Sequence, residues 1–300
     1  MQTDKPAMVD EQQSSAESWS CVTCGRSASG DYCSHCGEKR RQGHDFSLRH
    51  VFAEAMEGFF HLDSKIFLSL RMLVLHPGRL TSEFFLGRKK PYMPPLQLFF
   101  VCNLIFFVLQ PLTGLDILAP PLPSHLSNNL YGGTAQRLVT HRLAARHISG
   151  AEQNAQFRDR FDQASSLHAK SLVILMVPML ALVLALFFFR SHKFAAEHIV
   201  FSLHFYAWWL LWILTVLIIT AVAVLACRKG GFSMSNSALD IMATGLEFGG
   251  FGVYLFFALR SFYQERVIIA LAKAGAIAWI GFYLLFAYRF ILFFTVLYST

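Results

Sequence analysis

Four of the six cysteines are spaced to bind a metal ion. Cys21 and Cys24 form one CxxC pair, and Cys33 and Cys36 form a second pair after eight intervening residues. Each pair is followed directly by a glycine, at the position where a knuckle turn needs a positive φ. Four thiolates at this spacing predict a closed, tetrahedral Zn²⁺ site. Because no coordination position stays open, we expect the zinc to be structural and to stabilise a small ribbon.

Other interpretations of this segment are possible. Two disulfides would require an oxidising compartment, whereas the charge distribution described below predicts a cytosolic position. His35 or His44 could replace one cysteine as a ligand. The basic residues 39–41 could bind nucleic acid, but attraction to anionic lipid headgroups is the better explanation beside a membrane.

The elements that position this ribbon belong to a membrane protein. Hydrophobic residues make up 54% of the 300 residues and charged residues only 15%, whereas a soluble domain carries roughly 25% charged residues. Five segments approach the roughly 20 apolar residues that cross a bilayer as a helix. We therefore predict an all-α polytopic membrane protein with about five transmembrane helices. Their expected spans are about 96–115, 171–189, 199–226, 238–259 and 274–297.

The basic residues predict an orientation. Eight of them precede the first span or lie in the second-to-third and fourth-to-fifth connections, which share one side: Arg88, Lys89, Lys90, Arg190, Lys193, Arg260, Arg266 and Lys273. The positive-inside rule makes that side cytosolic, with the C-terminus on the other side. Arg228 and Lys229 count against this orientation.

The chain outside the spans divides into four further parts. We expect a disordered tail over residues 1–18, the ribbon over 19–43, amphipathic cytosolic helices over 44–94, and an outer loop at about 119–168 within the membrane domain 95–300. The loop is Pro-rich at first and helix-compatible later. Apolar residues recur at helical spacing over 48–60 and 66–74. These helices could lie in the membrane interface or pack together beneath the membrane domain.

Ionisable residues inside predicted spans are functional candidates, because a bilayer makes them costly. His204 lies in the third span, Glu247 in the fourth and Arg289 in the fifth, while Glu197 and His198 stand at an inner edge. Glu247 and Arg289 have similar predicted depths, so we expect them to face each other as a buried pair. That pair could fix helix packing or serve transport.

Several runs of residues resemble a family of bacterial inner-membrane proteins that is known only as a domain of unknown function. Its members combine an N-terminal double-CxxC ribbon with several membrane spans. The similar runs are residues 32–38, 61–63, 76–79, 85–92 and 197–205. The resemblance implies a bacterial cytoplasmic membrane and no particular activity. It adds weight to six candidate residues: Asp63, Arg79, Arg88, Glu197, His198 and His204.

We favour a non-enzymatic interaction or regulatory platform, with membrane lipid and a cytosolic or membrane protein as partners. One alternative is a small transporter or channel-like protein that uses His204, Glu247 and Arg289. A second is a membrane-embedded enzyme that acts on a lipid or a cofactor through Glu197, His198 and His204. The sequence contains no HExxH motif, GxSxG elbow or phosphate-binding glycine loop, which weakens the case for an ordinary hydrolase or nucleotide enzyme.

Overall fold

The computed structural model describes residues 18–40, 65–113, 117–148, 150–191, 193–229 and 236–300. The expected disordered tail falls almost entirely outside these residues. The first predicted amphipathic helix and the candidate Asp63 also lie outside them.

The ribbon consists of two similar turns. In the first, β1 (Trp19–Ser20) pairs antiparallel with β2 (Ser27–Ala28). In the second, a single bridge joins Tyr32 to Lys39. The few buried side chains of this unit centre on its cysteines, so the ribbon has no apolar core of its own to stabilise it.

Two short helices connect the ribbon to the helical bundle. They are α2 (Lys65–Leu75) and α3 (Arg79–Phe85). Gly78 separates them with a φ of 76°, and a Cβ at this position would lie 2.5 Å from the Ala258 carbonyl oxygen. The turn therefore needs glycine both for its backbone conformation and for close packing of α3 against the bundle.

The apolar side chains of α2 are divided between the bundle and the surface. Leu73 is buried, and Ile66 and Leu70 pack against the core. Phe67, in contrast, is 81% exposed. Apolar side chains on an exposed helix beside a bundle of this kind are suited to a membrane interface.

Within the part of the chain that the structure describes, five helical segments are long and apolar enough to cross a membrane, as predicted. They are α4 (Pro95–Leu109) with η2 (Gln110–Thr113), the continuous run that ends in α8 (Met176–Phe187), α9 (Ala195–Lys229), α10 (Asn236–Tyr263) and α11 (Val267–Ser299). The 35 residues of α9 span about 52 Å at about 1.5 Å per residue. This length exceeds a hydrocarbon core of about 30 Å, so α9 must tilt or protrude.

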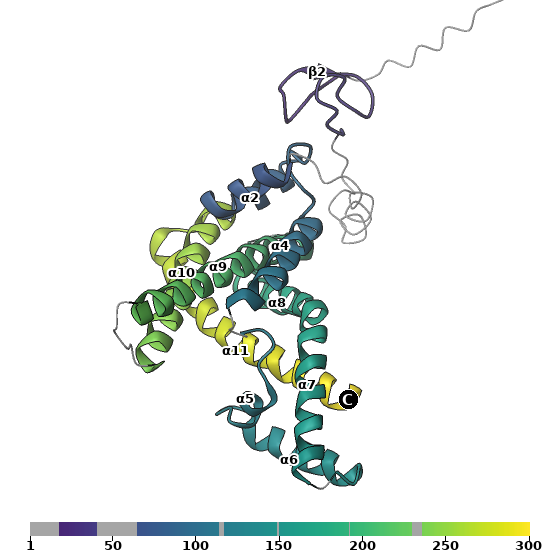
Figure 1. Cartoon of the computed structure of the whole chain (residues 1–300). Coiled ribbons are helices and arrows are strands. Elements are labelled where there is room, and N and C mark those ends of the chain that lie inside the picture. Colours follow the sequence, from purple (N-terminus) through teal and green to yellow (C-terminus); the bar gives the residue numbers. More distant parts are fainter. Residues whose placement is uncertain (1–17, 41–64, 114–116, 149, 192, 230–235) are drawn as a thin grey trace, which may run out of the picture.

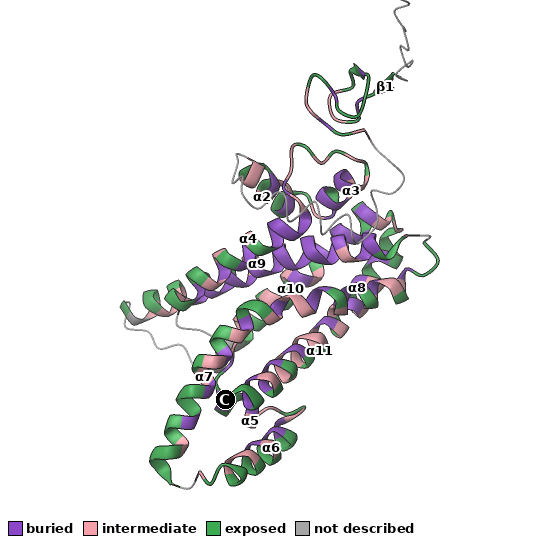
Figure 2. Ribbon diagram, turned by 90° about the vertical axis from the view of Figure 1, so that its right-hand side faces the viewer, coloured by how far each residue is buried: buried purple, intermediate pink, exposed green. Residues whose placement is uncertain are grey.

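Helix α9 occupies the centre of the bundle. It packs against α4, α8 and α10, and its N-terminal half is buried almost throughout (Figure 2). Aromatic rings fill the contact with α10: Trp208 stacks on Tyr254 with ring centroids 3.8 Å apart, and Phe205 meets Phe251 edge-on at 4.7 Å.

The long connection after α4 is largely helical. It contains α5 (Leu122–Leu126), α6 (Gly132–Ala145) and α7 (Ala151–Leu172), and α7 runs through η3 (Val173–Leu175) into α8. The combined helix has 37 residues, so its polar first half extends beyond one bilayer thickness. The expected span 171–189 is thus the end of a longer helix.

The ribbon and the α5–α7 region lie at opposite ends of the molecule (Figure 1). The α8–α9 and α10–α11 connections meet at the ribbon end. There Lys193 lies 4.2 Å from the Phe262 ring centroid, and Lys273 lies 4.0 Å from that of Phe188. Lys193, in the α8–α9 connection, and Lys273, in α11, therefore both lie at this end of the bundle.

Candidate metal centre

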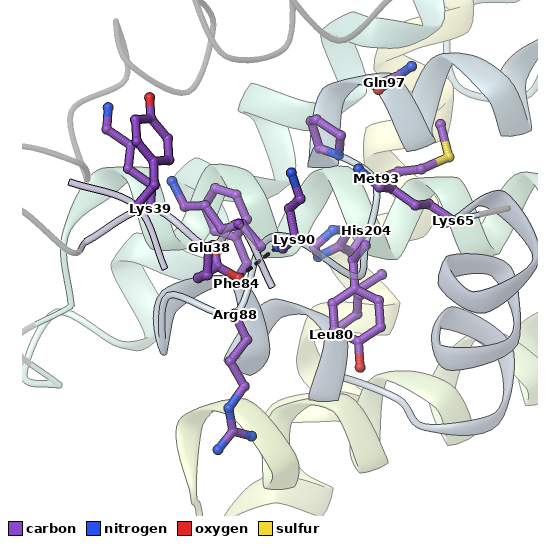
Figure 3. Close-up of a pocket in the computed structure, with 15 residues that line it drawn as sticks. Glu38, Lys39, Lys65, Leu80, Phe84, Arg88, Lys90, Met93, Gln97 and His204 are labelled. Carbon is purple, nitrogen blue, oxygen red and sulfur yellow. Dashed lines mark hydrogen bonds between the residues drawn. The ribbon is translucent and has the colours of Figure 1, made fainter. Parts of the chain in front are cut away.

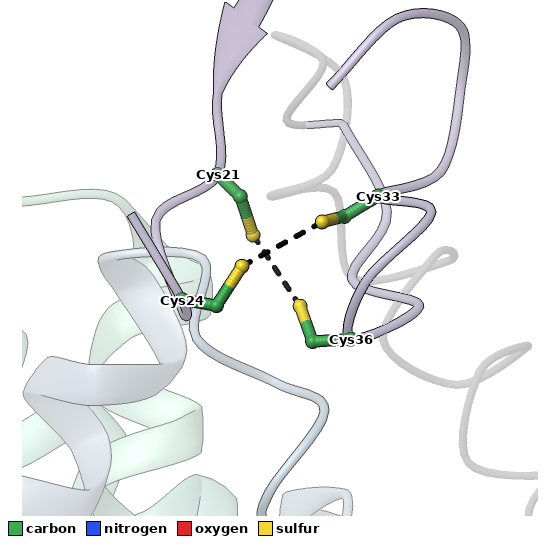
Figure 4. Close-up of side chains that lie close together, drawn as sticks. All are labelled: Cys21, Cys24, Cys33 and Cys36. Carbon is green, nitrogen blue, oxygen red and sulfur yellow. Dashed lines mark hydrogen bonds between the residues drawn. The ribbon is translucent and has the colours of Figure 1, made fainter. Parts of the chain in front are cut away.

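The four ribbon cysteines converge on one point (Figure 4). The Sγ atoms of Cys21 and Cys36 are 3.5 Å apart and those of Cys24 and Cys33 are 3.7 Å apart. All four sulfur atoms lie within 4.8 Å of one another. A tetrahedral ion with metal–sulfur bonds of roughly 2.3 Å needs sulfur separations of about 3.8 Å. Since a disulfide needs about 2.05 Å, the arrangement fits a metal ion and not two disulfides.

Local backbone bonds build the two turns that present these thiols. The Gly25 N–H donates to the Cys21 carbonyl oxygen and the Gly37 N–H donates to that of Cys33, each at 2.8 Å. Both glycines have positive φ, 73° and 71°, which an L side chain rarely adopts. The CxxCG spacing thus forms two equivalent knuckles.

The backbone also favours the thiolate that a metal ion requires. At Cys33, the backbone N–H groups of Cys36 and His35 lower the pKa of the thiol to about 6. At Cys36, the backbone N–H of Glu38 acts in the same direction, but burial and the three neighbouring thiols outweigh it and raise the pKa of that thiol. The group of potential ligands contains the four cysteines and not His35, and His44 lies outside the described residues.

A buried carboxylate and an arginine form hydrogen bonds between the ribbon and the helical bundle. The Glu38 side chain is 4% exposed. It accepts hydrogen bonds from the Thr23 hydroxyl at 2.6 Å and from the Lys90 backbone N–H at 3.0 Å. Arg88 donates through Nε to the Val22 carbonyl at 2.8 Å. The metal centre is therefore joined directly to the loop that leads into α4.

The candidates Arg79 and Arg88 share one acceptor. Glu83 of α3 lies 3.0 Å from Arg88 Nη1 and 3.8 Å from Arg79 Nε. Arg79 is largely exposed, so its ion pair is weak. Arg88 links Glu83 with the ribbon and has the larger structural role.

Two candidates at the start of α9 support the fold around them. Glu197 accepts the Phe194 backbone N–H at 2.8 Å and pairs with Lys193 at 2.9 Å, so it caps the helix as the acidic residue of a capping box does. His198 Nδ1 lies 2.7 Å from the Tyr263 hydroxyl at the end of α10. These contacts hold the α8–α9 connection and α10 together.

His204 has a different neighbour. Its Nδ1 lies 2.9 Å from the Thr81 hydroxyl of α3. The ring is 4% exposed, and its Nε2 has no hydrogen-bond partner among the described residues. Glu197, His198 and His204 therefore contact different elements and do not form one cluster.

The predicted buried pair of Glu247 and Arg289 is not a direct ion pair among the described residues. Arg289 instead donates through Nη2 and Nε to the Ile117 carbonyl oxygen, at 2.7 and 3.2 Å. Glu247 remains an electrostatic neighbour of Arg289. The long arginine side chain thus reaches a backbone carbonyl of the connection before α5 and satisfies it.

Sequence reasoning missed Glu38, Thr81 and Tyr263 as positioning residues. Glu38 follows the second knuckle directly, and that position was its only signal. Nothing in the local pattern marks Thr81 or Tyr263, because their partners are more than 60 residues away along the chain.

A family model described as a protein of unknown function (DUF3667) matches residues 63–107. This segment contains α2, α3 and most of α4. No curated protein and no solved structure matches the chain. Residues 63–107, which include the Arg88 contact to the ribbon, are therefore similar to a family whose function is unknown.

Proposed function

We propose that this chain is a bacterial inner-membrane protein in which a structural Zn²⁺ ribbon, on the cytosolic side, forms a non-enzymatic interaction or regulatory platform. The convergence of four thiols within 4.8 Å carries this proposal. Zinc suits an all-sulfur tetrahedral site of this size, and four protein ligands leave no position for a substrate. When bound, the ion would stabilise the ribbon, which has no sufficient core.

The contacts of the ribbon support a platform. Glu38 and Arg88 connect the metal-bearing knuckles to the loop before α4. A rigid ribbon seated on the helical bundle can present a defined surface or transmit a change between the two. The lysines gathered at the same end of the bundle support a cytosolic position under the positive-inside rule.

The polar candidates favour this role over the alternatives. An enzyme near the inner surface would need Glu197, His198 and His204 to converge, but each contacts a different partner. A transport path would need His204 and Arg289 to line one route. His204 instead contacts α3 at the ribbon end, while Arg289 contacts Ile117 in the long connection.

Metal analysis of the purified, detergent-solubilised protein tests the proposal. We expect about one zinc per chain, and loss of that zinc in the variant Cys33→Ser, Cys36→Ser. The matched control is Cys227→Ser, which removes a cysteine outside the cluster and should keep the zinc. Wild-type protein without zinc would overturn the ribbon, and a metal or haem that survives in the double variant would favour a membrane cofactor site.

The cytosolic position needs a separate measurement. A membrane-impermeant thiol reagent, applied after chelation, should label Cys21 or Cys36 in inverted membrane vesicles and not in intact cells with a permeabilised outer membrane. The opposite labelling pattern would place the ribbon on the other side.

A further inference from the structure

A cavity lies where the ribbon meets the helical bundle. Its volume is about 450 Å³, within the range of roughly 300–1,000 Å³ that is typical of small-molecule sites. Residues of the ribbon, of α2 to α4 and of α9 line it together. The cavity is therefore complete only when the ribbon is docked.

The charged side chains that line the cavity are mostly positive. Among the described residues that line it, five are basic and one, Glu38, carries a carboxylate. That carboxylate already accepts two hydrogen bonds. The five basic residues are Lys89 and the four that Figure 3 labels, Lys39, Lys65, Arg88 and Lys90. This excess of positive charge favours an anion and disfavours a metal ion.

Lys90 is placed for this role by the ribbon itself. Its backbone N–H is held by Glu38, and its Nζ passes so close to Gly37 that a Cβ there would lie 3.3 Å away. None of the ion pairs among the described residues involves Lys90. Its ammonium group can therefore act as a charged donor toward a ligand.

His204 supplies a second, independent indication of a ligand. It lines the same cavity, its side chain is almost fully buried, and its Nε2 has no partner among the described residues. If the Thr81 hydroxyl donates to Nδ1, the ring proton resides on Nε2 and provides a donor. A buried donor without a partner is costly, and an anionic oxygen in the cavity would satisfy it.

We propose that this cavity binds a phosphate group attached to an apolar body. Lys90 and His204 Nε2 donate to the phosphate oxygens, as charge-assisted hydrogen bonds to an anion. Leu80, Phe84 and Met93 contact the apolar part. The ligand is either the headgroup of an anionic phospholipid or a soluble phosphate ester. This inference rests on the proposed function, because the docked ribbon forms one wall of the site.

Calorimetric titration of the full chain in neutral detergent tests this inference. The probes are short-chain phosphatidic acid, short-chain phosphatidylcholine and glycerol phosphate. We expect phosphatidic acid to bind at least about tenfold more tightly than phosphatidylcholine, since one charge-assisted bond accounts for about that factor. Tight binding of phosphatidic acid alone assigns the site to a lipid headgroup, and equal binding of glycerol phosphate assigns it to a soluble ester.

Two variants with matched controls locate the binding site. Lys90→Gln should weaken phosphatidic acid binding about tenfold, whereas Arg190→Gln, which removes an exposed charge outside the cavity lining, should leave it unchanged. His204→Asn should weaken binding, whereas His125→Asn, a change at another buried histidine, should not. Equal losses in Lys90→Gln and Arg190→Gln would overturn the site in favour of general charge attraction.

Zinc content distinguishes the two proposals. Wild-type protein that holds one zinc per chain but binds no phosphate probe, or binds phosphatidylcholine equally well, overturns the cavity proposal and leaves the platform. Wild-type protein without zinc overturns the platform whatever the titrations give.

Discussion

The ribbon cysteines and the polar residues of α9 are held in place in opposite ways. The four cysteines that could hold a metal ion lie between residues 21 and 36, and bonds inside each knuckle direct their thiols to one point. Glu197, His198 and His204 lie within eight residues of one helix, yet they bond to the start of α9, to α10 and to α3. In the ribbon, local turns bring the four thiols together. In the bundle, tertiary contacts hold the three polar side chains of α9 apart.

The difference has a physical cause. The buried side chains of the ribbon centre on its cysteines, and under the proposed function a metal ion held by these converging thiols would supply its stability. In the bundle, each polar side chain without a partner is costly. Glu197 and His198 therefore bond to nearby groups, whereas His204 lines a cavity and its Nε2 has no partner among the described residues.

Metal removal should give the largest effect. A small effect would contradict the contrast between the ribbon and the bundle. After chelation we expect the amides of Cys33 and Gly37, which bond within the second knuckle, to exchange hydrogen at unfolded rates, because the ribbon folds only with metal. Amides in the centre of α9 should stay protected. Hydrogen exchange measured by mass spectrometry checks both, and a ribbon that stays protected without metal would contradict the prediction.

Gly78→Ala should destabilise the bundle by about 2–5 kcal/mol, the sum of a left-handed backbone penalty and overpacking. The new Cβ would meet the Ala258 carbonyl oxygen at 2.5 Å, and α3 would move away from α10. Unfolding in mixed detergent micelles measures the change in free energy. Gly133→Ala is the control, since a Cβ there meets nothing within 4 Å; an equal loss at both positions would refute the packing argument.

His125, in the long connection opposite the ribbon, should make stability depend on pH. Burial, with a contribution from Arg289, lowers the pKa of its imidazole from 6.5 to about 4. The unfolded chain therefore binds more protons between these pH values, and stability that is complete above pH 6.5 is lost as pH falls toward about 4. The loss approaches about 3 kcal/mol. Unfolding at several pH values checks this, and His125→Gln should flatten the profile.

Tyr263→Phe should cost about 1–2 kcal/mol, because it removes the 2.7 Å contact to His198 Nδ1 and leaves a buried nitrogen without its partner. Free energies of unfolding for Tyr263→Phe, His198→Phe and the double variant measure the coupling in a double-mutant cycle. Additive effects would show that the two side chains do not interact.

Arg88→Gln should give the smallest change, below about 1 kcal/mol, since the side chain is partly exposed and its ion pair is screened. Zinc content should not change, because the metal ligands are held within the ribbon. Metal analysis and thermal unfolding measure the two effects. Loss of zinc in this variant would show that the ribbon depends on the bundle and would remove the contrast between them.

Much of the architecture follows from local patterns. The five apolar segments predict the five candidate spans, because a stretch of this length and composition has no other stable state in a bilayer. The CxxCG repeats predict the cysteine cluster, because spacing and glycine conformation together determine a knuckle. The apolar recurrence over 66–74 predicts α2 (Lys65–Leu75).

Other features depend on which groups meet in space. Helix α7 runs unbroken into α8 although its polarity changes midway, because backbone hydrogen bonding does not require a uniform environment. Arg289 donates hydrogen bonds to the Ile117 carbonyl oxygen and not to Glu247. Predicted depth could not show this, since it carries no information about the direction of a side chain.

The sequence by itself determined the all-helical membrane class, the number of spans and the four converging thiols, because each depends on residues close together in the chain. Only the tertiary structure decided that Glu38 seats the ribbon on the loop before α4, that Thr81 holds His204, and that a cavity with basic walls lies between them. The physical reason is that these contacts join residues 52 and 123 positions apart, and such pairings are selected by packing and by the need to satisfy buried polar groups.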